Sequence, residues 1–108
     1  MRAPCVLAVA ALLSSLSIAV PSRAATPDIL ITKAGCTACH AKDKKLLGPA
    51  YHDVAAKYQG DPKAAADLVA KVRSGGKGVW GTVPMPAADT RKVSDADLAT
   101  IVAWILKQ

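Results

Sequence analysis

The chain has 108 residues, with 14 Lys or Arg side chains against eight acidic side chains, and a formal net charge of +6. This length fits a single small domain. The basic residues are dispersed along the sequence, which argues against a nucleic-acid-binding protein and favours a modestly basic surface for an acidic protein partner.

Residues 1–24 have the pattern of a secretory signal peptide. An apolar run spans residues 6–20, and Ser22 and Ala24 offer the small side chains of a cleavage site. The run has about 15 residues, fewer than the roughly 20 that a membrane-spanning helix needs, so we favour a removed signal over a retained anchor. We therefore predict a periplasmic protein without stable membrane insertion. Its mature domain, residues 25–108, has 84 residues, 12 of the 14 basic side chains and a net charge of +4.

The mature chain begins with a predicted short helix from about Pro27 to Ala34. Thr26 is its candidate cap, Pro27 suits its first turn, and Asp28 lies near the positive end of the helix dipole. Gly35 follows and allows the backbone to pass close to a bound group.

The next five residues, Cys36-Thr-Ala-Cys39-His40, have the Cys-x-x-Cys-His spacing by which c-type haem is attached. In such a motif each cysteine sulfur forms a thioether with a haem vinyl group, and the histidine ligates the iron. A redox dithiol would need a βαβ context, and a zinc site would need two more ligands, for which His52 and the signal-peptide residue Cys5 are the other candidates. We therefore predict one covalently bound haem c, which also supplies core that so small a domain lacks.

Residues 41–48 form a polar, lysine-rich segment. We interpret it as a solvated loop, with the alternative that its lysines surround an exposed haem edge and attract a partner. Gly48 and Pro49 end the loop, and proline fixes the backbone without offering an N–H group. A carbonyl in this stretch is therefore suited to accept the Nδ1 hydrogen of His40 and to leave Nε2 for the iron.

Two further helices are predicted from apolar residues at helical spacing. The first covers residues 49–59, and its apolar face consists of Tyr51, Val54, Ala55 and Tyr58. The second begins at Asp61 and stops at the glycine pair after Ser74. Its apolar face consists of Ala65, Leu68, Val69 and Val72. We interpret His52, on the first helix, as a surface histidine, with an axial ligand or a pH-responsive group as the alternatives.

Residues 77–91 show no periodicity, and prolines and glycines interrupt any regular element, so we predict an irregular loop that wraps one haem face. Met85 lies in this loop between Pro84 and Pro86 and is the only methionine outside the signal segment. A thioether suits the second axial position, because His/Met ligation raises the potential of electron-transfer haems. The alternative is a core methionine that fills a gap.

A last helix is expected after Ser94, which caps it, with Asp95 and Asp97 in its first turn. Its apolar stripe consists of Leu98, Ile101, Val102 and Ile105. We expect this helix to pack across the N-terminal helix and close the domain.

Four stretches of the mature chain resemble the small bacterial class I c-type cytochromes of the cytochrome c-551 (c8) type. They are residues 35–40, residues 46–58, residues 78–86 and the final Trp-Ile-Leu-Lys-Gln. The resemblance implies a compact all-α class I cytochrome c fold, with about four helices around one haem and one haem edge exposed.

The resemblance also implies roles for individual residues. Cys36 and Cys39 carry the haem, and His40 and Met85 are the axial ligands. The carbonyl of Pro49 accepts the histidine hydrogen bond. Trp80 donates its indole N–H to a haem propionate, unless it only packs in the haem pocket.

Two positions depart from the family pattern. Lys71 stands where relatives often have an arginine near a propionate, and lysine makes the less rigid contact. Ala88 stands where relatives often have an asparagine three residues after the methionine. The hydrogen bond to the sulfur of Met85 is then either missing or made by another residue, for which Thr90 is a candidate.

The resemblance implies a monomeric electron carrier with no catalytic residues, which transfers single electrons through the exposed haem edge. A cytochrome bc1-type complex is the expected kind of donor, and a nitrite reductase or a terminal oxidase the expected kind of acceptor. Two alternatives remain. One is a haem enzyme or gas sensor with an open iron site, which requires that Met85 does not ligate, and the other is a dedicated subunit of a larger oxidoreductase.

Overall fold

The computed structural model describes residues 17–20 and 25–108, and the rest of the predicted signal peptide and its cleavage site lie outside the described residues. The elements of this part are α1 (Pro27–Lys33), the 3-10 turn η1 (Cys36–Ala38), α2 (Tyr51–Lys57), α3 (Ala64–Ser74) and α4 (Asp95–Ile105). No helix among the described residues is both long and apolar enough to cross a membrane. The prediction of an all-α fold with about four helices is confirmed.

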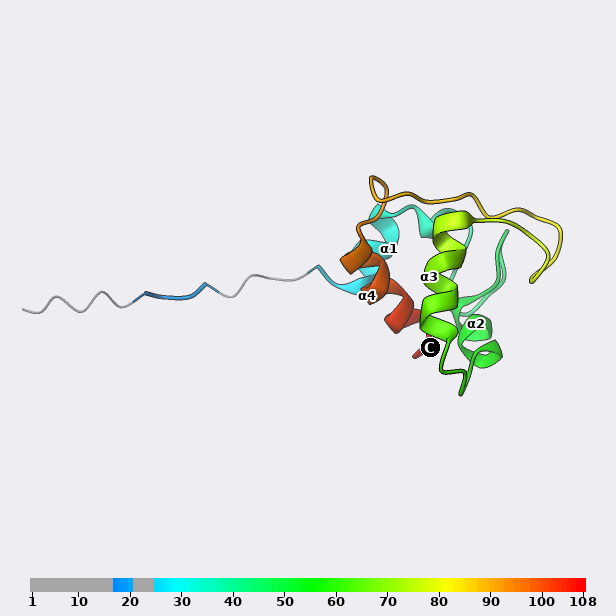
Figure 1. Cartoon of the computed structure of the whole chain (residues 1–108), viewed down its shortest axis with the longest axis horizontal. Coiled ribbons are helices and arrows are strands. Elements are labelled where there is room, and N and C mark those ends of the chain that lie inside the picture. Colours follow the sequence, from blue (N-terminus) through cyan, green and yellow to red (C-terminus); the bar gives the residue numbers. More distant parts are fainter. Residues whose placement is uncertain (1–16, 21–24) are drawn as a thin grey trace, which may run out of the picture.

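The central element is α4, which packs against α1, α2 and α3 (Figure 1). Its predicted stripe supplies the most deeply buried side chains of the core, namely Leu98, Ile101 and Val102. Leu30, Ile31 and Ala34 join them from α1 and its C-terminal end, and Tyr51 joins them from α2. The last helix therefore closes the domain across the first, as its apolar periodicity predicts.

The N-terminal ends of α4 and α1 test the two predicted helix caps. Ser94 caps α4, because its Oγ accepts a hydrogen bond from the backbone N–H of Asp97 at 3.1 Å. Thr26 occupies the N-cap position of α1, as predicted, but its side chain makes no cap hydrogen bond. Proline at the first position removes one of the N–H groups that a cap would have to satisfy.

The helix predicted over residues 49–59 is the shorter α2 in the structure. Backbone hydrogen bonds, and not the apolar periodicity, determine where it starts. The carbonyls of Ala41 and Lys42 accept the N–H groups of Tyr51 and His52 at 3.0 Å each. These contacts satisfy two of the free N–H groups of the first turn without a side-chain cap. They also attach the lysine-rich loop to the start of α2.

The start predicted for α3 is wrong by about three residues. The carboxylate of Asp61 accepts the backbone N–H of Lys63 at 2.8 Å and so closes a turn before the helix, which begins at Ala64. The buried face accordingly starts at Ala64, and Ala65 is exposed. Further along, Leu68, Val69 and Val72 pack against the core as predicted.

Candidate haem site

The Cys-x-x-Cys-His motif forms a single tight turn. Gly35 adopts a left-handed conformation with φ of 80°, which turns the chain away from the end of α1 and into η1. The N–H groups of Cys39 and His40 both donate to the carbonyl of Cys36, at 3.2 and 3.0 Å. Both cysteines are half-buried. Burial raises the pKa of the Cys36 thiol, and the nearby ammonium group of Lys92 opposes that rise.

The imidazole of His40 is held by the carbonyl of Pro49, which lies 2.8 Å from Nδ1. With hydrogen on Nδ1, the ring donates this bond and presents an unprotonated Nε2, the form in which histidine ligates a metal. The structure thus brings together the two residues that the sequence paired. The backbone supports the arrangement, because the N–H of Gly48 donates to the carbonyl of Cys39 at 2.8 Å.

Two further residues fix the imidazole, and sequence reasoning did not single them out for this role. A Cβ atom on Gly48 would lie 2.5 Å from Cε1 of His40, closer than any real contact, so only glycine fits here. The Tyr51 ring also stacks on the imidazole, with centroids 5.4 Å apart and an angle of 18° between the planes. The sequence signals are a glycine next to Pro49 and, two positions after that proline, an aromatic residue whose helical spacing indicates only a core position.

The hydroxyl of Tyr51 is buried and has no hydrogen-bond partner in the described part of the chain. Burial raises the pKa of this phenol above its ordinary value of 10.0, because the charged phenolate would lose its hydration. The edge of the Tyr51 ring also meets Trp104 of α4, with centroids 5.5 Å apart. Tyr51 therefore connects the histidine to the packed core.

Met85 is half-buried in the irregular loop that follows α3, and it is fixed to the end of that helix. Gly76 and Met85 exchange two backbone hydrogen bonds of 2.9 Å each. Gly75 precedes them with φ of 65°, and a Cβ atom there would lie 2.4 Å from the carbonyl oxygen of Met85. The backbone of the loop can come this close to α3 only because Gly75 has no side chain.

The other residues that the sequence singled out differ in exposure and in the segment of the fold where they lie. Trp80 is 40 % exposed, and the ammonium nitrogen of Lys57 lies 5.5 Å from its ring centroid, within cation–π range. Lys71 is half-buried and its Nζ approaches Gly76, at the base of the Met85 loop. Thr90 is exposed and lines a hollow of about 190 Å³ beside the end of α1. His52 is exposed, as expected of a surface histidine.

The family model for cytochrome c matches residues 29–108 of this chain. The chain belongs to the cytochrome c family. It is 46 % identical over 82 residues to cytochrome c-551 of Pseudomonas aeruginosa, a match that covers 76 % of each sequence. It is 53 % identical over 78 residues to cytochrome c-551 of Allochromatium vinosum, covering 72 % of this chain and 81 % of the relative.

A solved structure agrees with the family assignment. The crystal structure of cytochrome c552 from Nitrosomonas europaea superimposes with a TM-score of 0.67 at 45 % identity, over 72 % of this chain and 94 % of that chain. The protein is thus a small class I c-type cytochrome with the all-α fold of that class. It carries one covalently bound haem c and transfers electrons.

The chain's own side chains fit such a group. Two thiols can attach a porphyrin covalently, and an imidazole with a free Nε2 and a thioether are donors that suit its iron. Large apolar side chains are exposed on the two segments that follow the motif and α3, namely Leu46, Leu47, Val79, Trp80 and Val83. An apolar plate placed against these segments would cover surface that a small domain otherwise leaves in water.

Proposed function

We propose that this cytochrome c is a periplasmic carrier of single electrons, with its haem attached to Cys36 and Cys39 and its iron held between His40 and Met85. The observation that carries the proposal is the contact of 2.8 Å between Nδ1 of His40 and the carbonyl of Pro49. This contact uses one ring nitrogen and leaves the other for iron.

Each residue has a distinct task in this carrier. The bound haem c supplies an iron centre that gains and loses one electron. Cys36 and Cys39 fix the porphyrin edge through two thioether bonds, so the haem cannot dissociate. His40 is made a stronger donor by its hydrogen bond to Pro49, and Met85 is a soft ligand that favours the reduced iron and raises the potential.

With His40 and Met85 both holding the iron, no place would remain there for a substrate, and electrons would leave through an exposed haem edge. Trp80 and Lys71 lie at the tip and the base of the Met85 loop, where an indole N–H and an ammonium group suit haem propionates. Their partial exposure supports a position at the rim of the site.

The partners are expected to be redox proteins with an acidic docking surface. Three exposed lysines lie on the loop that leads from His40 to α2, namely Lys42, Lys44 and Lys45. The loop is held at both ends, by the bond from Gly48 to Cys39 and by the bonds from α2 to its first two carbonyls. Its charges are therefore presented in a fixed place, which favours rapid and oriented encounter.

In this proposal the protein is exported, loses residues 1–24 and works as a monomer. A cytochrome bc1-type complex is the kind of donor we propose, and a nitrite reductase or a terminal oxidase the kind of acceptor. The net charge of +4 in residues 25–108 supports an acidic face on both partners.

The test is the optical spectrum of the exported protein, oxidised and reduced, with and without carbon monoxide. A low-spin spectrum, a weak sulfur-to-iron band in the oxidised state and no response to carbon monoxide are the expected results. Met85→Ala should abolish the band and allow carbon monoxide to bind, whereas the matched loop variant Val83→Ala should do neither. A high-spin wild type that binds carbon monoxide at once would instead indicate an open iron site, as in a haem enzyme or gas sensor.

A further inference from the structure

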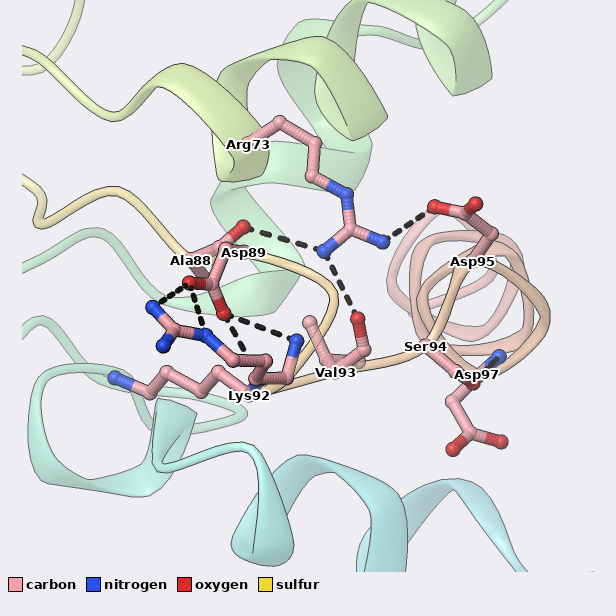
Figure 2. A network of polar contacts seen from close by, with 9 residues as sticks. Arg73, Ala88, Asp89, Lys92, Val93, Ser94, Asp95 and Asp97 are labelled. Atoms are coloured by element: carbon pink, nitrogen blue, oxygen red, sulfur yellow. Dashed lines mark hydrogen bonds and ion pairs between the residues drawn. The ribbon is translucent and has the colours of Figure 1, made fainter.

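Arg73, in the last turn of α3, connects three segments of the chain (Figure 2). One of its terminal nitrogens, Nη1, donates to the carbonyls of Ala88 and Val93 at 3.2 and 2.9 Å. The other, Nη2, donates to the carboxylate of Asp95, the first residue of α4, at 2.5 Å. The side chain is only 22 % exposed, so these contacts are partly shielded from water.

The segment that Arg73 holds is the return path of the Met85 loop. Ala88 lies three residues after Met85, and its N–H donates to the carbonyl of Val72 at 2.9 Å. On the other side of Met85, the two hydrogen bonds with Gly76 fix the outward path. Met85 therefore lies between two backbone segments that are both hydrogen-bonded to the C-terminal end of α3. Of these hydrogen bonds, only those of Arg73 are made by a side chain among the described residues.

We propose that Arg73 is a positioning residue that keeps the sulfur of Met85 on the iron. The inference rests on the His40/Met85 ligation of the proposed function. Movement of the backbone on either side of Met85 away from α3 would carry the sulfur off the iron. A guanidinium that binds the carbonyls of Ala88 and Val93 opposes that movement on the return side.

The chemistry of arginine explains why this residue type is needed. Its planar fork reaches two carbonyls and one carboxylate at once, and its charge shortens and strengthens each bond. Asp95 balances the charge and orients the fork. Lysine has a single nitrogen on a flexible stem, so Arg73→Lys retains part of this set and should give only partial rescue.

The experiment measures how readily Met85 is displaced by imidazole in the oxidised, haem-loaded protein. Loss of the sulfur-to-iron band reports the displacement, and the reduction potential is measured in parallel. A charge-assisted hydrogen bond of this kind changes an opening equilibrium by about tenfold. Arg73→Gln should therefore bind imidazole about tenfold more tightly and have a lower potential, with Arg73→Lys between it and the wild type.

Three further variants separate positioning from general stability. Val102→Ala weakens the core on the buried face of α4 without touching the Arg73 contacts, and Arg91→Gln removes an exposed arginine of the same loop that pairs with Asp89. Neither should change imidazole binding. Asp95→Asn keeps the two carbonyl contacts and should tighten imidazole binding about twofold. This variant tests the role of Arg73 even if Arg73→Gln does not fold.

The outcomes distinguish the two proposals. A wild type without the sulfur-to-iron band would overturn the His40/Met85 ligation itself. A wild type that has the band overturns only the role of Arg73 if Arg73→Gln or Asp95→Asn binds imidazole like the wild type. The role of Arg73 is also overturned if Val102→Ala and Arg73→Gln lose the same free energy of unfolding and shift imidazole binding by the same amount.

Discussion

Replacement of Gly48 by alanine should loosen the proximal histidine. An alanine Cβ would lie 2.5 Å from Cε1 of His40 and 2.9 Å from each ring nitrogen, whereas ordinary contacts begin near 3.4 Å. The imidazole must therefore move by roughly 1 Å, which would break its bond of 2.8 Å to the carbonyl of Pro49. Overpacking of this kind costs about 1–3 kcal/mol and the lost hydrogen bond about 1 kcal/mol, so we expect a destabilisation of about 2–4 kcal/mol.

The assay is urea unfolding of the haem-loaded protein, followed by haem absorbance and helical circular dichroism, with the reduction potential as a second measurement. Gly60→Ala is the matched control. Gly60 has φ of 76° and nothing within 4 Å of a Cβ atom, so this change has only a backbone penalty of about 1 kcal/mol. Gly48→Ala should be the more destabilising and should alone change the potential. Equal stability of the two variants, with an unchanged potential, would refute the steric argument.

Three other predictions concern burial, pH and salt. Tyr51→Phe removes a buried hydroxyl that lacks a partner in the described residues. The change should raise the free energy of unfolding by up to about 1 kcal/mol. A lower free energy of unfolding would instead show that the hydroxyl gains a partner when haem is bound. The guanidinium of Arg91 and nearby backbone N–H groups lower the pKa of Asp89 below its ordinary 3.8. Because the folded-state pKa is the lower one, the stabilisation is present above pH 3.8 and is lost as the pH falls through the lowered pKa. Asp89→Asn should therefore be less stable than the wild type at pH 7, and unfolding measured at successively lower pH should show this difference shrinking. Electron transfer to an acidic redox partner should slow as ionic strength rises, and the double change Lys44→Gln and Lys45→Gln should flatten that dependence; rates independent of salt in the wild type would argue against electrostatic docking.

The haem chemistry of this protein is visible in its sequence because the relevant signals are local. Cys36, Cys39 and His40 lie within five consecutive residues of one turn, so their spacing alone defines the attachment chemistry. Met85 stands out because it is the only methionine of residues 25–108 and lies between two prolines. Helical periodicity likewise predicted the buried stripe of α4, since one face of a helix is set by residues three and four positions apart.

Contacts between distant segments were decided only by the tertiary structure. The start of α2 depends on carbonyls of the lysine loop, and that of α3 on a turn closed by Asp61, which periodicity does not encode. The need for glycine at position 48 follows from an imidazole eight residues earlier in the chain. In the sequence, Arg73 is simply a basic residue near the end of a helix. Only the fold brings it to carbonyls that lie 15 and 20 residues further along the chain. The sequence alone therefore determined which groups can hold the haem, while the packing of the chain decided which residues hold those groups in place.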